Sequence, residues 1–113
     1  MGRAVSQLVA NNAVDHIDLN FGCPAAKVTR KGGGAAVPLK KNLLRAIIRA
    51  AVSEGKKGGI PVTCKFRMGI TDDLLTYLHT AEIAGEEGVA WVALHARTVE
   101  QHYAGQARWP AIA

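Results

Sequence analysis

Hydrophobic and polar residues alternate along three short stretches of the chain. In the first, Ile17, Leu19 and Phe21 are separated by polar residues, and the stretch ends at a Gly-Cys-Pro turn. The second covers residues 60–67 and the third residues 89–97, each with apolar side chains on one face and more polar side chains on the other. A period of two residues predicts three β-strands.

Between the predicted strands, apolar residues recur at the spacing of an α-helix. This pattern predicts a helix over residues 38–55, with Pro38 in its first turn and Gly55 as its C-cap. A second helix is expected to start at Thr71, as its N-cap, and to end at Gly88. Shorter helical patterns lie at residues 4–10 and from residue 109 onward. Four basic residues of the 38–55 helix are expected to be solvated and are assigned no function: Lys40, Lys41, Arg45 and Arg49.

Helices that alternate with strands predict a parallel sheet, because each crossover helix returns the chain to the same end of the sheet. In such folds, ligands bind beyond the carboxyl ends of the strands. Polar residues gather at those ends here: Asn20, Cys23, Lys65, Arg67, His95 and Arg97. The sequence therefore predicts an α/β fold with an active-site rim. We interpret it as part of a (β/α)8 barrel, with about three parallel strands and intervening helices.

The second predicted strand carries two cations on its polar face. Lys65 and Arg67 are expensive to bury on a strand between helices unless an anion meets them, and the alternative is an edge strand with one solvated face. Cys64 lies on the apolar face, where we expect it only to pack. The Gly-rich run at residues 32–34 lacks the Gly-Lys-Ser/Thr end of a P-loop, and a flexible turn is its simplest interpretation.

Cys23 is the candidate for chemistry. It stands at the end of a strand, between a glycine and a proline, where the turn lifts its thiol out of the sheet. A small buried cysteine before a loop is the alternative. Asp18 and Asn20 on the same strand, and the Gly-rich run that follows, favour a functional thiol.

The composition is that of a globular domain that binds anionic partners. The 113 residues are 49% hydrophobic and 20% charged, and the net charge of +5 favours phosphates or nucleic acid as partners. Two distant cysteines without a secretory signal predict free thiols and a cytoplasmic location. The sequence has no apolar run of membrane-spanning length and no cysteine or histidine spacing typical of a metal site, so neither a membrane nor a metal is expected.

Three motifs together resemble the tRNA-dihydrouridine synthase family. They are residues 18–24 (DLNFGCP) with Lys27-Val28 and residues 33–36, then residues 62–69 (VTCKFRMG), then residues 95–98 (HART) with residues 101–105 and 107–109. The likeness covers nearly the whole chain. It departs from the family at Arg108, where an acidic residue is more usual before the tryptophan.

This resemblance implies an FMN-dependent oxidoreductase. NADPH would reduce FMN, which would pass a hydride to C6 of a uridine in tRNA while Cys23 protonates C5. The resemblance also implies a role for the other rim residues. Asn20, Lys65, His95 and Arg67 would contact the cofactor, with Lys65 near flavin N1, and Arg97 and Tyr103 would contact the tRNA.

A complete barrel of this kind takes about 250 residues. We therefore expect residues 1–113 to form part of an FMN-binding catalytic domain, without its N-terminal strands, its C-terminal strands and the helical tRNA-binding domain. Alone, the segment is expected to be inactive.

Two other functions stay open at this point. Dihydroorotate and dihydropyrimidine dehydrogenases are flavin barrels that also place a cysteine near a pyrimidine, but they have no need of the 95–103 motif or of the positive charge. A non-catalytic RNA-binding remnant would explain the charge, although phosphate binding does not require Cys23, Lys65 and His95 at one rim.

Overall fold

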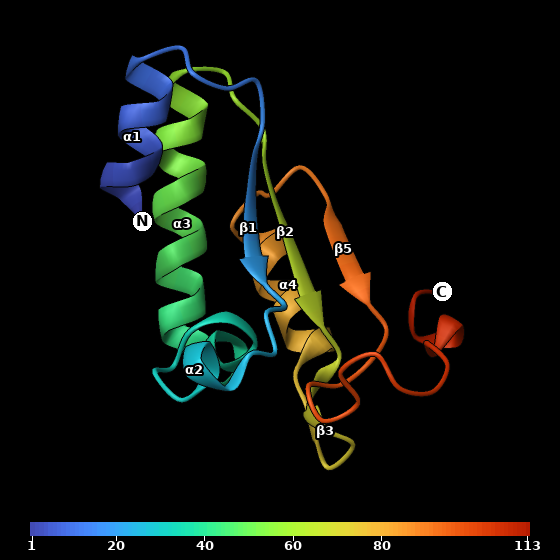
Figure 1. Cartoon of the computed structure of the whole chain (residues 1–113). Helices are drawn as coiled ribbons and strands as arrows, with labels where there is room; N and C mark the ends of the chain where they lie inside the picture. The colour runs from blue at the N-terminus through green and yellow to red at the C-terminus, as the bar shows by residue number, and fades with distance from the viewer.

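Three parallel strands form the centre of the structure, a computed structural model that describes all 113 residues. They are β1 (Ile17–Phe21), β2 (Val62–Arg67) and β5 (Val92–His95), in the order β1-β2-β5. Figure 1 shows that all three point the same way, so their carboxyl ends share one edge. The register places Asn20 opposite Lys65, and Arg67 opposite His95.

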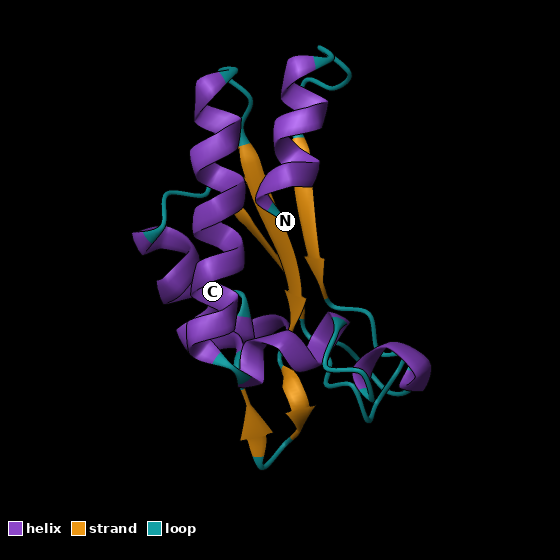
Figure 2. Ribbon diagram, turned by 90° about the vertical axis from the view of Figure 1, so that its left-hand side faces the viewer, coloured by secondary structure: helices purple, strands orange, loops and turns teal.

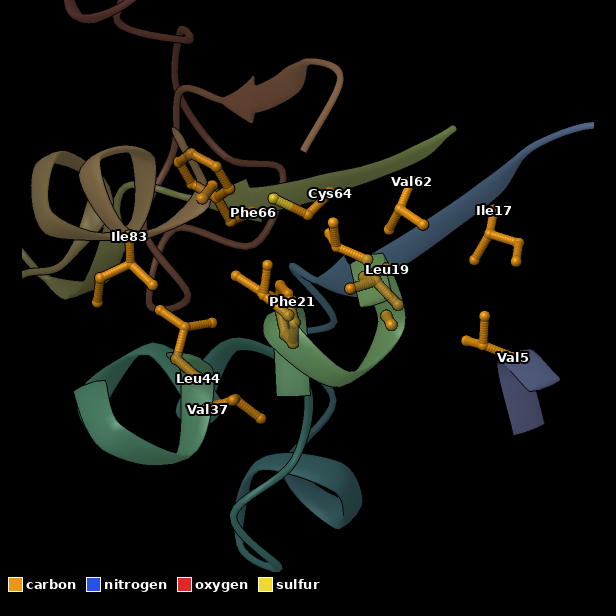
Figure 3. Packing of buried hydrophobic residues seen from close by; sticks show 14 residues of the cluster. Val5, Ile17, Leu19, Phe21, Val37, Leu44, Val62, Cys64, Phe66 and Ile83 are labelled. Carbon is orange, nitrogen blue, oxygen red and sulfur yellow. The ribbon is translucent and has the colours of Figure 1, made fainter. Parts of the chain in front are cut away.

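Helices cover one face of this sheet. The main ones are α1 (Gly2–Ala10), α3 (Lys41–Lys57) and α4 (Tyr77–Glu86), and Figure 2 shows α1 and α3 standing in front of the strands. Shorter elements are α2 (Ala26–Thr29), the 3-10 helices η1 (Gly34–Leu39) and η2 (Trp109–Ala111), and the strands β3 (Gly69–Thr71) and β4 (Leu74–Leu75). Apolar side chains of β1 and β2 interlock with α3 in the core, as Figure 3 shows.

The predicted fold class is confirmed. Three parallel strands alternate with helices, and the apolar faces predicted for the first two strands are buried, although Thr63 and Arg67 on the polar face of β2 are buried as well. Cys64 is fully buried, as expected for a residue that packs, and burial raises its thiol pKa to about 11. The strand β2 is central rather than an edge strand, so the alternative of a solvated edge does not apply to it.

The predicted start of the second helix at Thr71 is wrong. Residues 69–75 form the β3-β4 hairpin, and α4 begins only at Tyr77. The carbonyl of Met68 fixes this start, because it accepts hydrogen bonds from the N–H groups of Thr76 (2.8 Å) and Tyr77 (3.1 Å). A Cβ at Gly69 would overlap the carbonyl oxygen of Leu74, so the tight hairpin depends on glycine there.

The other boundaries also shift. Pro38 belongs to η1 rather than to α3, which starts at Lys41 and ends at Lys57, with Gly58 as its C-cap. Gly55 is therefore not the cap. It lies inside the helix, where a Cβ would stand 2.8 Å from the carbonyl oxygen of Ile60, and its absence lets α3 pack closely on the chain before β2. Within the predicted strands, β2 begins at residue 62 and β5 covers only residues 92–95.

Two of the basic residues expected to be solvated join α3 to α4. Arg45 and Arg49 both donate to the carboxylate of Glu87, at 2.7 and 2.8 Å, and Arg45 also pairs with Glu86. Hydrogen bonds from Arg49 and then Arg45 lower the pKa of Glu87 to about 2. None of the helices is both long enough and apolar enough to cross a membrane.

We expect the 113 residues expressed alone to self-associate and to hold no tightly bound FMN. Strands β1 and β5 each have an unpaired edge, and large apolar side chains beside β5 and α4 are exposed, among them Leu78 (66%) and Trp91 (57%). Light scattering after gel filtration, with a visible absorbance spectrum, tests this. A monomer that melts cooperatively and carries flavin would contradict the prediction.

Candidate active site

The Cys23 turn is held in place from both sides. On one side, the Gly22 N–H donates to Oδ1 of Asn20 at 2.8 Å, so the last polar side chain of β1 caps the turn. On the other, the carbonyl of Cys23 accepts a hydrogen bond from the N–H of Ala35 at 3.0 Å. The thiol itself is free and half-buried. A half-buried thiol on a fixed turn can meet a ligand at the carboxyl edge of the sheet.

The Gly-rich run is more than the flexible turn suggested by its sequence. Gly34 has a φ of +52°, and a Cβ there would stand 2.6 Å from the carbonyl oxygen of Cys23 and 3.0 Å from its Cβ. The run therefore folds back under Cys23 and supports it. Only glycine allows both this contact and this backbone conformation.

We expect Gly34→Ala to slow catalysis about 10²-fold in a full-length enzyme that carries this segment, because displacement of a reacting group by 1 Å has an effect of about this size. Gly32→Ala is the matched control. Its φ is also positive, at +79°, but a Cβ there meets only Lys40 Nζ, at 3.8 Å. Both variants share the backbone strain, and only Gly34→Ala displaces Cys23. Equal catalytic rates in the two variants would refute this support role.

Arg67 is the buried centre of the carboxyl edge. Its side chain is 3% exposed, and it donates to backbone carbonyls of two loops: to Gly22 at 3.0 Å, to Thr98 at 3.0 Å and to His102 at 2.7 Å. Burial lowers its pKa, and the three carbonyls supply the partners that the sequence suggested an anion would supply. Arg67 thus ties the turn before Cys23 to the loop after β5.

Tyr103 lies next to Arg67, on the side that faces solvent. The guanidinium carbon of Arg67 is 5.3 Å from the centre of its ring, and the ring of His95 is 5.9 Å from it, centre to centre. The Tyr103 side chain is 74% exposed. An aromatic face held over a cation and open to solvent is suited to stack on a base.

A cavity of about 590 Å³ opens beside β5. Lys65, His95 and Arg97 contribute its charged and titratable side chains. Arg97 Nη2 donates to the carbonyl of Gly105 at 3.0 Å, whereas its buried Nε has no partner. Burial, and then the positive charges of Arg67, Lys65 and Arg97, lower the pKa of His95. The imidazole is therefore neutral at neutral pH, and its Nε2 accepts from Arg97 Nη1 at 3.2 Å.

Comparison with known proteins gives the family of the chain. The family described as dihydrouridine synthase (Dus) matches residues 3–113. The chain belongs to the dihydrouridine synthase family. A probable tRNA-dihydrouridine synthase of Mycobacterium leprae is 53% identical over 109 residues, which are 96% of this chain and 28% of that protein. Probable synthases of Mycobacterium tuberculosis (strain CDC 1551 / Oshkosh) and of Synechocystis sp. are 51% and 35% identical over 97% and 100% of the chain, and over 28% and 31% of their own lengths.

The resemblance in the sequence is thus confirmed, and the chain spans about 28% of the length of the first two of these Dus relatives. The structure brings the predicted site residues of this Dus segment to one edge, in two groups. Asn20, Cys23 and Arg67 surround the β1 turn, while Lys65, His95 and Arg97 line the cavity. Tyr103 lies between the groups, and neither it nor Cys23 lines the cavity. Their individual roles stay predictions.

Sequence reasoning missed the residues that shape the loop after β5. The Thr98 N–H donates to Oε1 of Gln101 at 3.0 Å, and the Gln101 N–H donates to Oγ1 of Thr98 at 3.3 Å. This reciprocal pair holds the turn that carries Tyr103. The spacing Thr-x-x-Gln is that of a capping box and could have signalled it. No three His, Cys, Asp or Glu side chains come together as a metal site.

Proposed function

We propose that this chain carries the proton donor and part of the cofactor site of a tRNA-dihydrouridine synthase, an FMN-dependent oxidoreductase that reduces the C5–C6 double bond of uridine in tRNA. The observation that supports this best is that the fixed Cys23 turn and the cavity lined by Lys65, His95 and Arg97 lie at the same carboxyl edge of the sheet, in a chain of the Dus family. The tRNA substrate and the free thiols fit a cytoplasmic enzyme.

The residues around the cavity fit an anionic flavin cofactor. Lys65 is exposed and has no ion pair, and the buried Nε of Arg97 has no hydrogen-bond acceptor. Lys65 can therefore meet a ligand without breaking a contact within the chain, whereas the outer nitrogens of Arg97 are already bonded to His95 and Gly105. When bound, FMN supplies the hydride for C6 of the uracil ring, and NADPH is the proposed source of its electrons. Lys65 would stand near flavin N1, where a positive charge favours reduction, and the neutral His95 would bind the cofactor beside it.

Cys23 would complete the reaction by donating a proton. Addition of hydride at C6 leaves negative charge at C5, so an acid is needed on that side of the base. Three hydrogen bonds fix the turn that presents the thiol. Asn20 Oδ1 accepts from the Gly22 N–H, the Cys23 carbonyl accepts from the Ala35 N–H, and Arg67 donates to the Gly22 carbonyl. Because the groups that fix the turn act before the base arrives, the donor is preorganised.

The tRNA would meet the loop after β5. A uridine must leave its stack to reach a buried site, and an exposed aromatic face can receive an unstacked base. Tyr103 offers such a face, and Arg97 lies on the neighbouring wall of the cavity. We therefore propose that both contact the RNA rather than the reacting atoms.

The direct test uses a full-length enzyme that carries this segment, with unmodified tRNA. We expect the purified protein to contain FMN and to form dihydrouridine when NADPH is supplied, as measured by mass spectrometry of the digested tRNA. NADH in place of NADPH tests the reductant. A flavoprotein that oxidises dihydroorotate or dihydropyrimidines instead, or a flavin-free protein that only binds RNA, would refute the proposal.

Lys65→Ala is expected to weaken FMN binding or slow flavin reduction by NADPH, because it removes a positive charge from the cavity. Lys65→Arg should restore the function only in part, since a planar guanidinium does not replace a compact ammonium. Lys56→Ala, an equal charge change at the far end of α3, is the control. Normal flavin content and normal NADPH oxidation in Lys65→Ala would leave Lys65 as a solvated strand residue.

A further inference from the structure

The positive charge of the chain is concentrated in one segment. Residues 19–53 contain seven of the 14 Lys and Arg residues and none of the nine Asp and Glu residues. The rest of the chain therefore has more acidic than basic residues. Hence the net charge of +5 arises in the part of the chain that begins within β1 and ends inside α3.

Within this segment, five cations are free. Arg45 and Arg49 are neutralised by Glu86 and Glu87. The other five are exposed and take part in no ion pair, and we call them the basic surface: Lys27, Arg30, Lys31, Lys40 and Lys41. An anion can therefore bind to them without displacing a carboxylate.

The basic surface lies beside Cys23. Its residues come from α2, from the Gly-rich turn and from the start of α3, which lie together near the tip of β1 in Figure 1. Gly34 packs directly under Cys23, and Lys40 Nζ lies 3.8 Å from where a Cβ of Gly32 would be. Ala35, Val37 and Pro38 are buried and anchor this part of the chain, so the cations stand on a fixed support.

Helix stability does not account for these charges. Lys40 is the N-cap of α3 and Lys41 its first residue, and the first turn has no acidic residue. Positive side chains are disfavoured at this end of a helix by its dipole, whereas Lys56 and Lys57 at the other end are favoured. A ligand with negative charge would compensate for the unfavourable placement.

We propose that the basic surface binds the phosphates of the RNA strand next to the uridine that Cys23 protonates. This inference rests on the proposed function, since it takes tRNA as the substrate. Five free cations spread over α2, the Gly-rich turn and the start of α3 suit a phosphodiester backbone better than a single small anion. Bound there, the strand would position its unstacked base at the neighbouring Cys23 turn.

The two ends of α3 provide a matched pair of variants in a full-length enzyme that carries this segment. Lys40→Gln/Lys41→Gln removes two charges from the basic surface, and Lys56→Gln/Lys57→Gln removes two charges from the far end of the helix. We expect only the first variant to bind unmodified tRNA transcript more weakly. Its affinity for tRNA should also depend less on salt. Between 50 and 200 mM salt, the fold-decrease in affinity should be about threefold smaller for each phosphate contact removed.

The KM for tRNA should rise in the first variant while kcat stays the same, because the phosphates are bound equally before and during the reaction. NADPH oxidation and flavin content should match the wild type. Equal tRNA binding by both variants and the wild type would overturn the proposal, as would an equal loss in both. A wild-type enzyme that forms no dihydrouridine would refute the proposed function instead.

A measurement on the wild type needs no variant. Acetylation of lysines with and without tRNA, read by mass spectrometry, should show protection of Lys27, Lys31, Lys40 and Lys41 but not of Lys56. Unchanged labelling of the four lysines with tRNA bound would overturn the proposal and leave an acidic protein as the alternative partner.

Discussion

Cys23→Ala in a full-length enzyme that carries this segment is expected to lower dihydrouridine formation by about 10²–10⁴-fold, which is the usual contribution of a positioned general acid. The same variant should keep its flavin and its reduction by NADPH, because that half-reaction involves no proton transfer to uridine. The thiol is half-buried on a turn fixed by Asn20 and Ala35, so its removal should leave the surrounding backbone in place.

The decisive assay mixes the pre-reduced variant with unmodified tRNA in the absence of oxygen and follows flavin reoxidation. Cys64→Ala is the control, because Cys64 is fully buried on the apolar face of β2 and its raised pKa makes it unreactive. Cys23→Ser should keep only a trace of activity, since a hydroxyl is a weaker acid than a thiol. Reoxidation of Cys23→Ala at the wild-type rate would show that Cys23 has no part in the chemistry and only fills the turn as a small residue.

The sequence predicted the elements that a single local pattern determines. In β1, Ile17, Leu19 and Phe21 alternate with exposed residues because only one face of the strand meets the helices. The same alternation separated Cys64 from the polar face of β2 and so distinguished it from Cys23. Where burial follows a period of two residues, the pattern alone is enough.

Features that depend on distant residues were not visible. The Thr71-Asp72-Asp73 sequence resembles a helix start, but the Met68 carbonyl and the close approach at Gly69 impose a hairpin. The role of Gly34 depends on a carbonyl 11 residues earlier in the chain, which no local pattern reveals. Backbone carbonyls carry no sequence signature, and the partners of Arg67 could not be predicted for that reason.

Arg67→Met is the second variant with a large expected effect. Methionine fills much of the same space but leaves the carbonyls of Gly22, Thr98 and His102 without their donor. Each buried carbonyl left unpaired costs about 1–3 kcal/mol, so we expect a clear fall in the free energy of unfolding. Arg67→Lys should recover part of it, because one ammonium cannot match the spread of the guanidinium. Arg45→Met, which removes a partly exposed, ion-paired guanidinium, is the control and should lower the free energy of unfolding far less than Arg67→Met.

Measurements of the catalytic rate then distinguish a positioning role of Arg67 from a merely structural one. If Arg67 acts by holding the Gly22 carbonyl and therefore the Cys23 turn, Arg67→Met should slow flavin reoxidation by tRNA in the wild-type background but add little once Cys23 is alanine. Independent damage to the fold would make the two losses multiply. A loss of flavin in Arg67→Met at temperatures where the variant is folded would instead support the predicted contact between Arg67 and the cofactor. The double variant therefore decides whether Arg67 serves the thiol, the flavin or only the packing of the two loops.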